Sequence, residues 1–263
     1  KDFSTIITDA LPDIQLQANG QCFPLYWYEK KKKIQVGLFE KVEDDYIRRD
    51  AISDFILDQA HTRYGLRVTK EDIFYYVYGL LHSPDYRKTF ANDLKKMLPR
   101  LPLVEKPADF WAFSKAGRQL TELHLNYEDQ KKPPEVTVTG LEHKDFTVTK
   151  MSFPAKGKTD TIKYNAHITV SNIPEKAYQY IVNGKSAIEW IMERYAVTTH
   201  KESGIKNDPN DWAIEHNNLR YILDLLLSVI TVSVATVDIV AGLPRLEWPP
   251  SSASPEIMMT LMS

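Results

Sequence analysis

The sequence contains very little cysteine. Among its 263 residues, Cys22 is the only one, so an internal disulfide and a thiolate-rich zinc site are both excluded. A reducing, cytoplasmic setting fits this composition best. Because Cys22 lies beside Phe23 and Pro24, we expect it to be a small buried hydrophobic residue.

The motifs of common catalytic centres are also lacking. The seven histidines form no HExxH motif and no pair at a spacing of three or four residues, which argues against a metal site. There is no GxSxG motif, and the one cysteine has no histidine near it in the sequence, so nothing predicts covalent catalysis. By elimination, we predict that this chain is not itself an enzyme and holds no cofactor or metal.

One segment matches a phosphate-binding loop only in part. Asn183-Gly-Lys-Ser186 has the end of that motif, but Gln179 stands where its first glycine is required. We expect Ser186 or Gly184 to begin a helix, which would place Lys185 at a helix terminus where a phosphate could bind.

Neither sign of charge dominates the composition. The formal net charge is -2 and the isoelectric point is about 6.4, which argues against a dedicated nucleic-acid-binding protein. The charges are unevenly spread, however. Six lysines and two acidic residues lie between Lys150 and Lys185, whereas four basic and eight acidic residues follow from Lys201 onward. A local positive face is therefore compatible with the sequence.

The longest apolar run extends from Leu219 to Leu243. A membrane-spanning helix needs roughly 20 apolar residues, and Arg220, Asp224 and Asp238 bracket this run too closely. We predict a buried core helix from about residue 218 to residue 241. The chain begins with Lys1 and has no signal region, so we expect it to be a piece of a longer protein.

The first half of the chain alternates between strand and helix patterns. Alternating apolar residues predict strands, and a period of 3.6 predicts helices. The predicted strands are 5–8, 14–17 and 23–28, and the predicted helices are 47–64, 70–82, 85–97 and about 107–123. Thr69 and Asp72 are typical of a capping box. The four aromatic residues between Phe74 and Tyr78 are too many for one buried stripe, so some rings must meet a second surface.

The polar stretch 127–134 is the best candidate for a domain boundary. We predict one domain over residues 1–134 and a second over 135–263. The second has predicted strands at 136–139, 146–153 and 161–170, and predicted helices at 175–182, 186–195 and 218–241. The predicted fold class is α+β: an N-terminal mixed sheet with helices, then a small antiparallel sheet and a C-terminal helical bundle.

Several segments, taken in order, resemble a known family. Leu80-Leu-His-Ser-Pro-Asp-Tyr-Arg87, followed by Leu98-Pro-Arg-Leu-Pro102, looks like the target-recognition domains of restriction-modification systems. The segments 21–24, 70–79, 182–186 and 203–212 resemble the C-terminal specificity region of type ISP single-polypeptide restriction-modification enzymes, which are often labelled DEAD/DEAH box helicases. The resemblance covers nearly the whole chain.

The resemblance implies a role within a larger bacterial, cytoplasmic enzyme. In this family one chain joins a nuclease, a DEAD/DEAH-like ATPase motor, a coupler, an adenine N6-methyltransferase and the recognition domain. ATP, magnesium and S-adenosylmethionine are thus implied for the parent protein and none of them for this chain. The implied partners are double-stranded DNA and the methyltransferase and helicase-like domains of the same chain, without a membrane.

The implied mechanism is direct readout of DNA. Strand ends and loops would enter the major groove, and phosphate contacts would fix the register. Charge and position give these candidate DNA-binding residues: Lys30, Lys31, Lys32, Lys33, Arg48, Arg49, Arg63, Lys150, Lys156, Lys158, Lys163 and Lys185. The lysine run is also typical of a solvated hairpin turn, and Arg48 and Arg49 could equally face solvent.

Two other classes of function remain open. A scaffold or interaction module that docks on the methyltransferase or motor would fit the modest net charge and the acidic tail. An independent enzyme acting on a small molecule would need a convergent polar pocket, which the sequence does not predict. Salt-dependent binding of DNA separates the first hypothesis from both of these.

Overall fold

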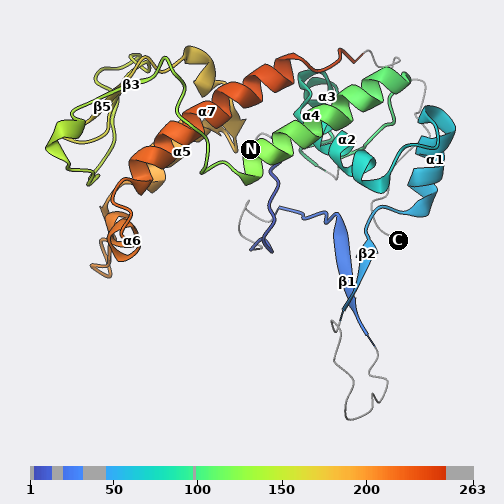
Figure 1. Ribbon diagram of the computed structural model, residues 1–263, viewed down its shortest axis with the longest axis horizontal. Coiled ribbons are helices and arrows are strands. Elements are labelled where there is room, and N and C mark those ends of the chain that lie inside the picture. Colours follow the sequence, from blue (N-terminus) through green and yellow to red (C-terminus); the bar gives the residue numbers. More distant parts are fainter. Residues whose placement is uncertain (1–2, 14–19, 32–45, 97–98, 247–263) are drawn as a thin grey trace, which may run out of the picture. The chain divides into compact units, whose positions relative to one another are not determined.

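The computed structural model describes residues 3–13, 20–31, 46–96 and 99–246 (Figure 1). Its contacts divide the chain into two compact units. Unit 1 contains Lys1–Asp9 and Leu120–Gly242, and unit 2 contains Ala10–Gln119 and Leu243–Ser263. This division falls after Gln119, whereas the sequence predicted a domain boundary between residues 134 and 135. The two predicted domains therefore remain a prediction. Helices combined with small antiparallel sheets confirm the α+β class.

Unit 2 has a two-stranded ribbon followed by helices. Its elements are β1 (Tyr26–Lys30), β2 (Tyr46–Asp50), α1 (Asp54–Tyr64), α2 (Lys70–His82), α3 (Pro84–Thr89) and most of α4 (Pro107–Leu125). The predicted capping box of α2 is confirmed, because Thr69 Oγ1 accepts from Asp72 N and Asp72 accepts from Thr69 N. Ser83 caps α3, with Pro84 in its first turn.

Tyrosines of unit 2 bond to the segment 100–104, and one of them, Tyr76, belongs to the aromatic group 74–78 that was predicted to meet a second surface. Three buried tyrosines donate their hydroxyls to its carbonyl groups: Tyr64 to Val104 at 2.5 Å, Tyr76 to Pro102 at 2.5 Å and Tyr86 to Arg100 at 2.6 Å. Tyr76 Oη also accepts from Val104 N at 3.2 Å. Burial raises the pKa of Tyr76 well above its ordinary value, so the phenol stays protonated.

Helices α2 and α4 approach so closely that only glycine fits where they cross. A Cβ atom on Gly117 would lie 1.8 Å from the Tyr75 carbonyl oxygen, and one on Gly79 would lie 2.3 Å from the Phe113 carbonyl oxygen. No real Cβ atom tolerates such distances to backbone, so the helices would have to separate. The core of unit 2 packs around this crossing.

Unit 1 is built on its last helix. Its sheet has the antiparallel order β3-β5-β4, and two short hairpins, β6-β7 and β8-β9, complete its strands. Its elements are β3 (Thr137–Thr139), η1 (Leu141–His143), β4 (Ile162–Lys163), β5 (Thr169–Ser171), η2 (Glu175–Tyr178), β6 (Ile181–Val182), β7 (Lys185–Ser186), α5 (Ala187–Arg194), β8 (Thr198–Thr199), β9 (Lys206–Asn207), α6 (Asn210–Glu215) and α7 (Tyr221–Ala241).

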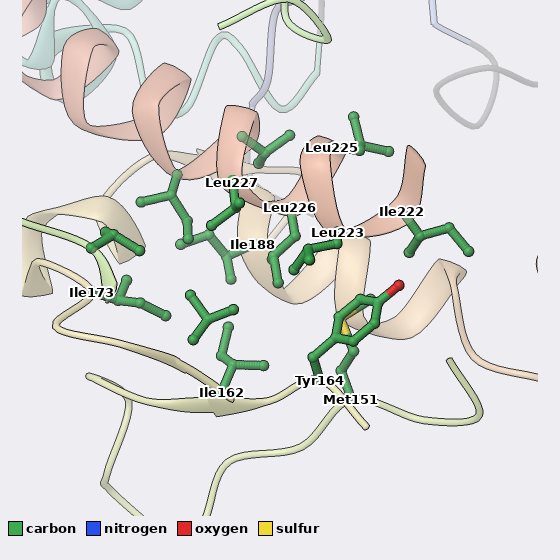
Figure 2. Packing of buried hydrophobic residues seen from close by; sticks show 14 of the residues in the cluster. Met151, Ile162, Tyr164, Ile173, Ile188, Ile222, Leu223, Leu225, Leu226 and Leu227 are labelled. Carbon is green, nitrogen blue, oxygen red and sulfur yellow. The ribbon is translucent and has the colours of Figure 1, made fainter. Parts of the chain in front are cut away.

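Helix α7 supplies the core of unit 1. By length and composition it could cross a membrane, but 61% of its apolar window is buried within the protein. Leu223 and Leu226 are fully buried and pack in one cluster with Ile162, Tyr164 and Ile188 from the sheet and α5 (Figure 2). The prediction of a buried core helix is confirmed.

Several sequence predictions in unit 2 and at the N-terminus are wrong. Residues 5–8 form no strand, and the predicted strand 14–17 lies outside the described residues. The segment 47–64 is not one helix, because its start pairs with β1 and the helix begins only after its N-cap, Ser53. Helix α3 ends at Thr89, well before the predicted residue 97. Cys22 is exposed rather than buried.

Three further predictions in unit 1 are wrong. The segment 161–170 is not one strand, because β4 ends at Lys163 and β5 begins only at Thr169. Residues 146–153 form no strand, apart from a single bridge between Ser152 and Lys163. The predicted helix 175–182 is a short 3-10 turn followed by β6. The reason is the pair Asn183-Gly184, whose positive φ angles of 50° and 87° are those of a tight hairpin turn joining β6 to β7.

We expect Gly117→Ala to destabilise unit 2 by about 3 kcal/mol, the upper range for overpacking a well-packed interior. Denaturant unfolding measures the change. Gln119→Ala, at an exposed position of the same helix, is the matched control and should change stability by less than about 0.5 kcal/mol. Equal stability of the two variants would contradict the close approach of α2 and α4.

We expect Tyr76→Phe to cost about 1–3 kcal/mol, because it leaves the Pro102 carbonyl and the Val104 amide buried without this partner. Tyr75→Phe removes a hydroxyl from a half-buried position of the same helix and should cost much less. Chemical denaturation of both variants gives the comparison. A neutral Tyr76→Phe would show that segment 100–104 does not depend on this tyrosine.

A half-buried histidine should make unit 1 sensitive to acid. Burial lowers the pKa of His124 to about 4, below the unfolded value of about 6.5. The unfolded chain therefore binds the proton first, so this stability is full above about pH 6.5 and is lost as the pH falls towards about 4, by roughly 3 kcal/mol in all. His124→Gln should flatten that loss in urea titrations over this range. The control His143→Gln, at an exposed position, should retain it.

Candidate nucleic-acid interface

The most exposed element of unit 2 is the ribbon of β1 and β2. Its strands pair antiparallel from Tyr26 opposite Asp50 to Lys30 opposite Tyr46, and the ribbon projects away from the helices of unit 2 (Figure 1). Only Tyr26 is partly buried, and the other residues of both strands are exposed. Such a ribbon contributes little to a core, and its large side chains are exposed.

Paired residues of an antiparallel ribbon lie on the same face, and successive residues lie on opposite faces. The register therefore gives two faces of different character. We call one the tyrosine face, which consists of Tyr26, Tyr28, Lys30, Tyr46, Arg48 and Asp50. The other is the tryptophan face, which consists of Trp27, Glu29, Ile47 and Arg49. Tyr28 and Tyr46 are 62% and 54% exposed, and Trp27 is 48% exposed.

The two arginines of β2 have different surroundings. On the tryptophan face, Arg49 Nε and Nη2 donate to Glu29 Oε2 at 3.2 and 3.1 Å, so a carboxylate of the ribbon itself offsets its charge. On the tyrosine face, the Arg48 guanidinium carbon lies 4.3 Å from the centre of the Tyr26 ring, a cation–π contact. No ion pair of the described residues involves Arg48.

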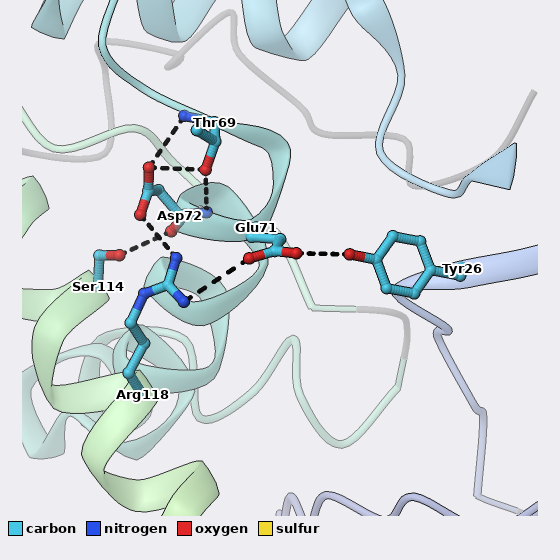
Figure 3. A network of polar contacts seen from close by, with 6 residues as sticks. All are labelled: Tyr26, Thr69, Glu71, Asp72, Ser114 and Arg118. Atoms are coloured by element: carbon cyan, nitrogen blue, oxygen red, sulfur yellow. Dashed lines mark hydrogen bonds and ion pairs between the residues drawn. The ribbon is translucent and has the colours of Figure 1, made fainter.

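A polar network holds the base of the ribbon to α2 (Figure 3). Tyr26 Oη donates to Glu71 Oε1 at 2.5 Å, which raises the pKa of the tyrosine. Arg118 of α4 lies 3.8 Å from Glu71 Oε2 and donates to Asp72 Oδ1 at 2.8 Å. Ser114 donates to the Asp72 carbonyl at 3.0 Å. The chain of contacts thus runs from the tyrosine face through α2 to α4.

Two carboxylates strengthen the attachment of the ribbon to the helices. Lys70 lies 2.7 Å from Asp54 of α1 and 3.6 Å from Asp50 of β2, and its hydrogen bond with Asp54 raises the lysine pKa. Partial burial tends to raise the pKa of Asp72, but hydrogen bonds from Arg118 and Thr69 outweigh it and hold the pKa below its ordinary value. The acids at the start of α2 also face the positive end of its dipole.

The sequence candidates of the first half fall into three groups. Lys30 and Lys31 lie at and just after the end of β1, whereas Lys32 and Lys33 lie outside the described residues. Arg48 and Arg49 belong to the ribbon rather than to the start of a helix. Arg63 donates from Nη1 to the Leu103 carbonyl at 2.8 Å, so it supports the segment 100–104.

The candidates of the second half all belong to unit 1. Lys156 and Lys158 are exposed in the loop before β4, and Lys163 is exposed in β4. Lys150 lines a hollow of about 440 Å³. Lys185 is not left at a helix end for phosphate, because it pairs with Glu193 and lies 5.1 Å from the centre of the Trp190 ring. The predicted helix start is confirmed, because Ser186 is the N-cap of α5 and forms a capping box with Glu189.

Reasoning from charge missed the aromatic residues of the ribbon. Tyr28 lies in the strand before the lysine run and Tyr46 begins the strand that pairs with it, and their alternation with Trp27 and Ile47 is the signal that could have placed them on one face of a hairpin. Within the described part of the chain, no group of three or more histidine, cysteine or acidic side chains could hold a metal ion. The ribbon itself provides exposed rings and cations.

Comparison with known proteins finds a matching family model and several similar solved structures. The model of the type ISP C-terminal specificity domain matches residues 1–225. Among solved structures, the ATP-dependent type ISP restriction-modification enzyme LlaBIII bound to DNA is 43% identical, with a TM-score of 0.80. The match covers 94% of this chain but 15% of that one, so the present chain spans a small part of that enzyme. No curated protein matches.

Two further solved structures are similar. A nuclease-deletion mutant of the type ISP restriction-modification enzyme LlaGI, in complex with a DNA substrate mimic, is 50% identical over 68% of this chain and 14% of that one, with a TM-score of 0.63. A DrdV-DNA complex is 30% identical over 92% of this chain and 23% of that one, with a TM-score of 0.72. The chain belongs to the type ISP C-terminal specificity domain family.

Proposed function

We propose that this chain recognises the DNA target of a larger ATP-dependent restriction-modification enzyme. It would position duplex DNA for adenine methylation and cleavage by other domains of the same protein. The solved relatives with DNA bound support this proposal, as does the small share of their length that the chain covers. The parent protein would use ATP, magnesium and S-adenosylmethionine in the bacterial cytoplasm, and this chain would need none of them.

The observation that carries the proposal is the exposed ribbon. The major groove of DNA admits a two-stranded β-ribbon, and some regulators read DNA with such ribbons. Here the ribbon combines exposed tyrosines with Lys30, Lys31 and Arg48, and these cations could approach phosphates or base edges. The net charge of -2 is no obstacle, because the basic residues are concentrated locally.

A scaffold that does not touch DNA is the second candidate. Unit 1 exposes Trp212, Ile214 and Leu219 around α6, with exposed fractions of 44%, 57% and 56%. Exposed apolar side chains of this size are typical of protein contacts. This surface could dock on the methyltransferase or motor domain, and such docking is compatible with DNA binding by the ribbon of unit 2.

Fluorescence anisotropy with mixed-sequence duplex DNA at two salt concentrations tests the proposal. We expect binding that weakens steeply with salt, since each phosphate contact contributes a slope of about 0.9 in the logarithm of the binding constant. Charge reversal of Lys30 to Lys33 should weaken binding by at least about tenfold and reduce that slope.

The matched control reverses the charges of four exposed lysines elsewhere in unit 2, namely Lys88, Lys95, Lys96 and Lys106. An equal effect of both reversals would mean that net charge alone governs binding. Absence of binding by the unaltered chain at low salt would favour the scaffold.

A further inference from the structure

The ribbon presents two arginines as neighbours in the sequence, yet on opposite faces. Arg48 lies opposite Tyr28, and Arg49 lies opposite Trp27. A protein that needed only positive charge here could use both of them alike. Their contacts differ, however, and the difference indicates two separate roles.

Arg49 is engaged within the ribbon. Both of its contacts go to a single oxygen of Glu29, a residue of the partner strand on the same face. Binding DNA through Arg49 would require breaking these hydrogen bonds and would bring the Glu29 carboxylate towards phosphates of like charge. The pair instead links β1 to β2 across the tryptophan face, and cross-strand pairs of this kind stabilise a ribbon.

Arg48 is held in place without losing its donors. Its guanidinium lies over the Tyr26 ring, and the Tyr26 hydroxyl is bonded to Glu71, which in turn lies near Arg118. Stacking occupies the flat face of a guanidinium, whereas its N–H groups lie at the edge of the plane. An arginine that is already ordered loses less conformational entropy when it binds.

We propose that Arg48 is the base-reading arginine of the ribbon, that it recognises guanine in the major groove, and that Tyr26 and Glu71 are the residues that position it. The fork of an arginine matches the O6 and N7 acceptors of guanine, and this is the commonest specific contact between proteins and DNA. Tyr28 and Tyr46 flank Arg48 on the same face. Arg49 then acts as a structural residue. This inference rests on the proposed function, DNA target recognition.

The test separates base reading from charge. The chain is used to select duplexes from a library with a randomised segment, and the affinity for the selected duplex is divided by that for a scrambled duplex. Arg48→Lys keeps the charge but loses the fork. In Arg48→Lys we expect the ratio of the two affinities to fall by about tenfold or more. The salt dependence of binding should persist, and a guanine preference should disappear from one position of the selected sequence.

Arg49→Lys is the matched control, with the same change one residue away, and it should leave the ratio and the selected sequence unaltered. Tyr26→Phe keeps the ring under Arg48 and removes the bond to Glu71, so it should lower the same ratio by a smaller factor. Circular dichroism and thermal unfolding of each variant show whether the fold is retained.

Three outcomes would overturn the proposal. If Arg48→Lys retains the ratio and the selected sequence, Arg48 contacts phosphate or solvent. If Arg49→Lys has the larger effect, the assignment of the faces is wrong. In both cases the unaltered chain still binds DNA, so the proposed function survives. If the unaltered chain selects no duplex at all, both fail, and the tyrosine face serves a protein partner.

Discussion

The hydrogen bond from Tyr26 to Glu71 and the ion pair between Asp50 and Lys70 join the ribbon to the helices of unit 2. A two-stranded hairpin is marginally stable on its own, and nearly every residue of this one is exposed. Its direction relative to those helices therefore depends on the contacts at its base. Glu71 and its neighbour Asp72, which caps α2, both contact Arg118 of α4, so the start of α2 is tied to the ribbon on one side and to α4 on the other.

Helix α2 owes its own position to two constraints along its length. Near its middle, Tyr76 bonds to the segment 100–104, and Gly79 lies against the backbone of α4. The aromatic stretch that carried the family resemblance is thus largely a scaffold. The side chains that we propose to meet DNA lie instead on the strands before it, where the sequence could vary without disturbing the core. A specificity domain needs this separation, because its readers must change between targets while its frame stays constant.

A structural feature could be predicted from the sequence where it depends only on a short segment of the chain, and not where it depends on pairing with a distant segment. The capping box at Thr69, the helix from Pro107 and the apolar helix α7 were predictable, because caps and apolar periodicity are properties of short segments. The ribbon was missed in part, since β2 exists only through its pairing with β1 across the intervening lysine-rich segment. The turn at Asn183-Gly184 was predicted, but the pairing of β6 with β7 across it was not.

The candidate site was less predictable than the fold. Charge alone selected Arg48, Arg49, Arg63 and Lys185 as equals, and only side-chain contacts distinguish them. Arg63 supports a backbone carbonyl, Lys185 pairs with Glu193, and Arg49 pairs with Glu29. Such partners are distant or offset in the sequence, so no spacing rule could have found them. The exposed tyrosines carry no charge and could be found only through the pairing of the strands.

The most direct measurement is photo-crosslinking to duplex DNA from single positions of the ribbon, with benzoylphenylalanine placed at Tyr46 on the tyrosine face or at Ile47 on the tryptophan face. The account predicts crosslinks to DNA from position 46, which excess unlabelled target duplex suppresses, and few from position 47. Crosslinks to DNA from neither position, in a chain that still binds DNA, would contradict the claim that this ribbon is the reading element.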